Sequence, residues 1–126
     1  METEDARKQQ ARFWLDYSQQ LAAAIRYHEA LKAAERAVAL DETHAEAWYV
    51  TGTCLAMLAR YDEALTHFER ALAVNDHYVP AWDGKAWVFG IMGQKAQALA
   101  AVNRALELDP DYFEALKRKK RLEAME

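Results

Sequence analysis

Apolar residues recur along most of the chain at intervals of three and four positions, the spacing that places them on one face of an α-helix. Strict alternation of apolar and polar residues, which is typical of a strand, is almost absent, and the sequence holds only four Gly and two Pro. The pattern predicts an all-α protein of about seven helices. Their expected positions are 11–24, 28–40, 45–58, 62–74, 79–92, 96–108 and 113–126.

The pattern also repeats itself with a fixed period along the chain. Trp14, Trp48 and Trp82 are equally spaced, and Leu116 stands at the next place in the same series. Other sets of residues keep this spacing: Ala30, Ala64 and Ala98; Arg36, Arg70 and Arg104; and Ala37, Ala71 and Ala105. A period of this length predicts stacked copies of one unit that bury a shared core. We expect one domain, divided into a leader (1–10), repeats at 11–44, 45–78 and 79–112, and a C-terminal capping helix (113–126).

The residues that recur identify a family resemblance. The second repeat carries Trp48, Gly52, Leu55, Tyr61, Ala64, Phe68 and Ala71 at the positions typical of tetratricopeptide repeats, and the third carries Trp82, Ala86, Phe89, Gly93, Ala98, Ala105 and Pro110. The first repeat departs from the pattern by placing Ser18 where Gly52 and Ala86 stand. The sequence therefore resembles a tetratricopeptide repeat protein. The resemblance implies a right-handed superhelical solenoid of antiparallel helix pairs.

The two tryptophans of the third repeat have different expected roles. Trp82 and Trp87 are five residues apart, so they lie about 140° apart around one helix and cannot face the same surface. Trp82 belongs to the repeating set and is predicted to be structural, whereas Trp87 has no counterpart in that set. In the family that the sequence resembles, first helices line a concave groove. The groove positions that this implies are Leu15, Gln19, Tyr49, Thr53, Met57, Asp83, Trp87, Ile91, Lys117 and Arg121.

A largely apolar and aromatic groove of this kind suits a peptide or an amphipathic helix of another protein. We therefore predict a protein–protein interaction module, an adaptor or chaperone-like domain. A structural alternative for the groove is that Tyr49 and Trp87 merely stiffen the stack. The alternative function is a structural scaffold that self-associates through end-to-end stacking of repeats. Family members that grip terminal carboxylates of heat-shock proteins use cationic and amide side chains. Here those positions are Leu15, Gln19, Val50, Pro80 and Gly84, which argues against that specificity.

Charge and composition exclude several other classes. A net charge of −4 weighs against a nucleic-acid binder, and the basic run 117–121 is a local island at the end of a helix. Residues 1–10 lack the apolar segment of a secretion signal and no apolar run is long enough for membrane insertion, so we expect a cytoplasmic protein. The histidines lack metal-binding spacing and Cys54 stands among small apolar residues. We predict no enzyme activity, no metal and no cofactor.

Overall fold

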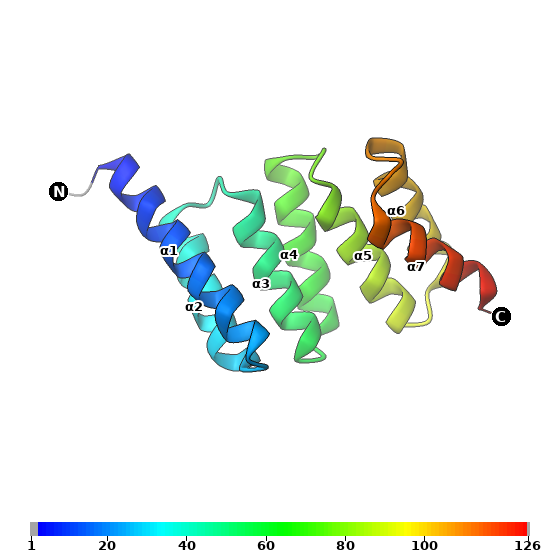
Figure 1. Cartoon of the computed structure of the whole chain (residues 1–126), viewed down its shortest axis with the longest axis horizontal. Helices are drawn as coiled ribbons and strands as arrows, with labels where there is room; N and C mark the ends of the chain where they lie inside the picture. The colour runs from blue at the N-terminus through cyan, green and yellow to red at the C-terminus, as the bar shows by residue number, and fades with distance from the viewer. Residues whose placement is uncertain (1–2, 126) are drawn as a thin grey trace.

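The computed structural model describes residues 3–125, and within them the chain forms a single row of helices with its two termini at opposite ends (Figure 1). No strand occurs in these residues, so the prediction of an all-α solenoid is confirmed. The helices are α1 (Glu4–Ala23), α2 (Tyr27–Leu40), α3 (Ala45–Met57), α4 (Tyr61–Val74), α5 (Val79–Ile91), α6 (Lys95–Leu108) and α7 (Phe113–Ala124). The pairs α1–α2, α3–α4 and α5–α6 correspond to the three sequence repeats.

The first helix begins earlier than the sequence pattern predicts. The sequence pattern predicts a leader over residues 1–10, but residues 4–10 form the first turns of α1, while residues 1 and 2 lie outside the described part of the chain. The Thr3 hydroxyl caps the helix by accepting a hydrogen bond from the Ala6 amide at 3.0 Å. Glu4 lies in the first turn and pairs with Lys8 at 3.2 Å. Capping and charge thus stabilise helical turns that precede the start predicted from the apolar pattern.

Each helix pair turns through a residue with positive φ. These residues, Ile25, Ala59 and Gly93, have φ of 62°, 60° and 76° and stand at the same position of successive repeats. Beyond each one, an amide bonds back to a carbonyl five residues earlier at 2.9 Å: Arg26 to Leu21, Arg60 to Leu55, and Gln94 to Phe89. This is the Schellman arrangement that ends a helix. Only the third turn has the glycine that this conformation favours.

Small residues allow the helices to approach closely at the centre of the stack. Ala30, Ala64 and Ala98 are completely buried. Phe68 of α4 is also completely buried, and it lies against two glycines, Gly52 of α3 and Gly84 of α5. A Cβ atom on either glycine would come within 2.8 Å of the Phe68 ring. The large ring and the two missing side chains therefore fit together as one packing unit.

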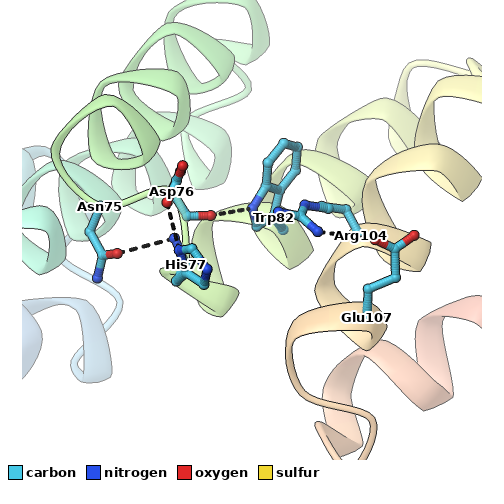
Figure 2. Close-up of polar contacts among 6 residues, drawn as sticks. All are labelled: Asn75, Asp76, His77, Trp82, Arg104 and Glu107. Carbon is cyan, nitrogen blue, oxygen red and sulfur yellow. Dashed lines mark hydrogen bonds and ion pairs between the residues drawn. The ribbon is translucent and has the colours of Figure 1, made fainter.

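The repeating tryptophans connect this core to the loops. Trp82 packs against both the larger core cluster, which runs from repeat 1 to α5, and the smaller cluster of repeat 3 and α7. Its indole N–H donates to the Asp76 carbonyl at 3.1 Å, fixing the loop before α5 (Figure 2). Trp48 donates in the same way to Glu42 at 2.8 Å. The ring of Trp82 has a packing role, as its place in the repeating set suggests, but it remains partly exposed.

Candidate functional site

The first helices of the repeats, together with α7, form one side of the stack, here called the inner face. Near its C-terminal end, α5 and α7 enclose an open hollow of about 270 Å³. Its floor contains the buried side chains of Ala86 and Leu122, and Trp87 forms one wall. The full lining consists of Ala86, Trp87, Gly90, Ile91, Arg118, Arg121, Leu122 and Met125. The hollow is therefore apolar, with two guanidinium groups on its α7 side.

The two arginines of this inner hollow differ in their electrostatic state. Arg118 donates two hydrogen bonds to the Asp83 carboxylate, at 2.7 and 3.1 Å. Asp83 is only 6% exposed, so the ion pair compensates a buried charge. Arg121 is exposed and makes no hydrogen bond or ion pair within residues 3–125. Arg121 is thus the cation of the hollow that remains available to an anionic group.

Tyr49 and Tyr112 lie near this ion pair, and Tyr78 lies against Tyr49. The ring of Tyr49 lies 5.8 Å from the rings of both Phe68 and Tyr78, measured between centroids. Burial raises the pKa of Tyr49 and, more strongly, that of Tyr78. Burial, with smaller contributions from Tyr49 and Asp83, raises the pKa of Tyr112 to about 12. All three hydroxyls therefore stay protonated at neutral pH and are able to donate hydrogen bonds.

Sequence reasoning missed Arg118, Tyr78 and Tyr112. The two tyrosines stand one repeat period apart, directly before α5 and α7, and His44 occupies the same position before α3. That spacing is a signal that could have included them. No such signal exists for Arg118, because its position in the repeats is held by Asp16, Val50 and Gly84.

Two of the predicted groove residues are not accessible to a partner. Leu15 is completely buried and belongs to the larger core cluster, so the prediction that it lines the groove is wrong. Burying the leucine side chain removes apolar surface from water, which stabilises the fold more than an exposed position would. Asp83 is also buried, and its carboxylate is engaged by Arg118. The prediction of Asp83 as a contact residue is corrected to a role in positioning Arg118.

The remaining predicted residues divide into four groups. Lys117 is exposed, but its ammonium lies 4.7 Å from the centroid of the Phe113 ring, and Arg118 lines the inner hollow in its place. Tyr49 and Thr53 are half-buried, and the Thr53 hydroxyl donates to the Tyr49 carbonyl at 3.1 Å. Trp87, Ile91 and Arg121 line the hollow. Gln19 and Met57 are exposed on the more N-terminal part of the inner face.

Groups capable of other chemistry are few. Cys54 is buried, and burial raises the pKa of its thiol, which disfavours the reactive thiolate. Among residues 3–125, no cluster of three or more His, Cys, Asp or Glu side chains is arranged to hold a metal ion. None of the helices in this part of the chain is both long and apolar enough to cross a membrane.

Comparison with known families agrees with the arrangement of helix pairs. A family described as "Tetratricopeptide repeat" matches residues 79–112, and one described as "Anaphase-promoting complex, cyclosome, subunit 3" matches residues 3–71. The chain belongs to the tetratricopeptide repeat (TPR) proteins. This confirms the resemblance on which the expected fold rested. A comparison with curated proteins gave no significant match.

Solved TPR structures share the fold over almost the whole chain. The first TPR domain of Spaghetti (RPAP3), bound to the HSP90 peptide SRMEEVD, has a TM-score of 0.86 at 19% identity, with 92% of each chain covered. The Arabidopsis OM64 TPR domain has a TM-score of 0.88 at 16% identity, covering 93% of this chain and 97% of that chain. YrrB, described as a TPR protein with an unusual peptide-binding site, has a TM-score of 0.80 at 27% identity, covering 95% and 58%.

Proposed function

We propose that this TPR protein is an interaction module that binds a segment of a partner protein in the inner hollow between α5 and α7. The observation that supports this most directly is the combination of an apolar, partly exposed lining with the guanidinium of Arg121, which has no ion-pair partner among residues 3–125. Ligand sites typically combine an apolar cavity with a few placed polar groups. Structural neighbours that are described as peptide complexes or peptide-binding proteins support the same function.

The chemistry of the hollow specifies the segment. Trp87, Ile91 and Met125 offer apolar contact to one large aliphatic or aromatic side chain. Arg121 offers a charge-assisted hydrogen bond to a carboxylate beside that anchor. Because Arg118 is already neutralised by Asp83, we expect one favoured acidic position rather than a strongly acidic motif. An amphipathic helix or an extended peptide meets this requirement equally well.

Selection from a displayed peptide library, followed by titration of the best peptide, tests the proposal. We expect peptides with an apolar anchor and a nearby acidic residue. Arg121→Glu should weaken their binding about tenfold or more, because it replaces the available cation by a repelling charge. Lys117→Glu is the matched control, since it reverses a charge on the same helix outside the hollow. Equal losses for the two variants would show that only the overall charge of α7 matters.

The same titration separates this site from capture of a free terminal carboxylate. Of the positions that hold the cationic grip in that class of TPR domain, Leu15, Val50 and Gly84 are buried here and Gln19 carries no charge. We expect amidation of the selected peptide's C-terminus to leave its affinity unchanged. We likewise expect no amidation-sensitive micromolar binding of SRMEEVD, and observing it would contradict this specificity.

Self-association is a second candidate function, and one residue favours it. Phe13 of α1 is 62% exposed, whereas the residues at the same repeat position, Ala47, Ala81 and Ala115, are completely buried. The N-terminal end of the stack therefore presents an aromatic ring where later helices pack on a preceding repeat. If the chain assembles end to end, sedimentation should show concentration-dependent oligomers that Phe13→Glu abolishes. The control Val74→Glu alters an exposed apolar residue elsewhere and should leave the oligomers intact.

A further inference from the structure

A second hollow lies on the other side of α5 from the inner hollow. It has a volume of about 370 Å³ and lies between α5 and α6. Figure 2 shows part of its wall, where the Trp82 ring lies between the loop that carries Asp76 and the Arg104 side chain. The complete lining is Trp82, Lys85, Phe89, Gln97, Ala100, Ala101 and Arg104. None of these residues lines the inner hollow.

The same hollow exists in repeat 1. There it lies between α1 and α2, with a volume of about 200 Å³. Its lining is Trp14, Tyr17, Leu21, Glu29, Lys32, Ala33 and Arg36. Each of these residues stands two repeats before one lining residue of the hollow between α5 and α6. We call the two together the outer hollows. The two hollows use the same repeat positions for every lining residue. The hollow is therefore produced by the geometry of the repeat.

In repeat 2 the equivalent space is occupied by a side chain of the protein itself. His67 stands at the position of Ala33 and Ala101, and its ring lies 5.6 Å from the ring of Trp48, between centroids. The His67 Nδ1 atom is 2.8 Å from the Glu63 carbonyl, which holds the ring in place. An aromatic ring thus fits against the repeating tryptophan. In repeats 1 and 3, alanine leaves that place on the tryptophan open.

The rims of the outer hollows carry positive charge. The Lys85 ammonium lies 5.0 Å from the centroid of the Trp82 ring, and the Arg36 guanidinium 4.7 Å from that of Trp14. Within residues 3–125, neither Lys85, Arg36 nor Lys32 forms an ion pair. Glu29, the acidic lining residue, is engaged through both oxygens by Arg26. These cations stand out on a chain whose net charge is −4.

We propose that the two outer hollows are a second binding surface, which takes acidic segments of a partner protein that insert one aromatic or aliphatic side chain beside Trp14 or Trp82. The apolar lining accepts the inserted side chain, as Trp48 accepts His67. Lys85, Lys32 and Arg36, which form no ion pair among residues 3–125, pair with the carboxylates that flank the inserted side chain. The surface goes beyond the proposed inner site, because it lies on different helix faces and shares no lining residue with it.

The four tryptophans allow a direct test, since each reports on a different place. The protein is labelled with 5-fluorotryptophan, and its fluorine resonances are followed while the peptide acetyl-DEDFLDED-amide is added. We expect the Trp14 and Trp82 resonances to shift and that of Trp48 to stay unchanged. The peptides acetyl-DEDGGDED-amide, which lacks the anchor, and acetyl-KRKFLKRK-amide, which reverses the charge, should shift neither.

Two exchanges between repeats provide matched variants. Ala101→His introduces the ring that fills repeat 2, and should weaken the binding reported by Trp82 about tenfold while the Trp14 response stays. His67→Ala opens repeat 2 and should create a new response at Trp48. The second variant only removes side-chain atoms, so it tests the inference even if Ala101→His unfolds the protein.

The remaining outcomes overturn the inference in distinguishable ways. A shift of Trp87 alone would place the acidic peptide in the inner hollow, supporting the proposed function and refuting the outer surface. Equal shifts with the cationic peptide would refute the role of the rim charges. No shift at Trp14 or Trp82 with millimolar peptide would refute the outer surface whatever the result of the peptide selection for the inner hollow.

Discussion

Repeats 2 and 3 have the same helix frame but different fillings. In repeat 2, Phe68 lies between Gly52 and Gly84. The equivalent positions in repeat 3 hold Val102, Ala86 and Arg118, so a smaller residue on the second helix is matched by larger ones on the first helices. The two repeats therefore distribute side-chain volume differently between their helices, and Arg118 pairs with Asp83 instead of leaving room for a large ring.

The surfaces of the two repeats differ for a related reason. His67 of repeat 2 packs against Trp48 at the position where repeat 3 has Ala101. Trp87 of repeat 3 packs against the core at the position where α7 has Arg121. Ala101 lines the outer hollow of repeat 3 and Arg121 lines the inner hollow. The comparison teaches that the arrangement of the helix pair sets where a cavity can exist. The size of the side chain at one repeat position then decides whether the cavity is open. The outer hollows follow from one such position, which holds Ala33, His67 and Ala101 in the three repeats.

The largest expected effect concerns the core of repeat 2. Phe68→Ala should lower the free energy of unfolding by about 4 kcal/mol, because both glycines leave a cavity that nothing else can fill. The equivalent change in repeat 3, Val102→Ala, removes fewer buried atoms and should cost about 2 kcal/mol. Urea denaturation followed by circular dichroism measures both. Similar losses would show that the two repeats do not differ in how they fill their cores.

The tryptophans of α5 sharpen the comparison of its two sides. Trp82→Ala should cost about 3 kcal/mol of stability, since the ring joins two core clusters and fixes the loop at Asp76. Trp87→Ala should cost about 1 kcal/mol of stability but weaken binding of the library-selected peptide by about 2 kcal/mol. Thermal melts and peptide titrations of both variants separate the effects. If Trp87→Ala leaves binding unchanged, the inner site is misplaced.

A methyl group added at Gly84 tests the fit of large against small. Gly84→Ala places a Cβ atom 2.8 Å from the Phe68 ring and should destabilise the protein by about 2 kcal/mol. Phe68→Leu in the same chain should recover part of this loss, because the smaller side chain leaves room for the methyl group. A double-mutant cycle on unfolding free energies measures this coupling. Strict additivity would mean that the two positions do not share one space.

The smallest effect compares the turns of the repeats. Ile25→Gly should stabilise the protein by about 1 kcal/mol, because a β-branched residue at φ 62° is strained and its side chain is 73% exposed. Gly93→Ala, in the equivalent turn of repeat 3, should destabilise it by a similar amount. The two melting temperatures should therefore shift in opposite directions. A loss of stability in Ile25→Gly would show that the exposed isoleucine makes contacts that outweigh its backbone strain.

Much of the fold follows from the sequence because it depends on local periodicity and on identities that recur at one spacing. The spacing of apolar residues predicts six of the seven helix starts to within a residue or so. The start of α1 is the exception, because Thr3 and Glu4 act through capping and charge and leave no apolar signal. The repeating position of Trp82 likewise predicts its packing role without any knowledge of distances.

The inner site depends on which neighbours each side chain meets, and only the tertiary structure decides that. Leu15, Tyr49, Asp83 and Lys117 hold one repeat position, yet the structure makes the first a core residue, the second half-buried, the third half of a buried ion pair and the fourth exposed. The helix that follows each one differs in side-chain size and charge. Burial and ion pairing depend on those neighbouring side chains. A position in the repeat therefore determines the direction in which a side chain leaves the helix, whereas its neighbours determine its environment.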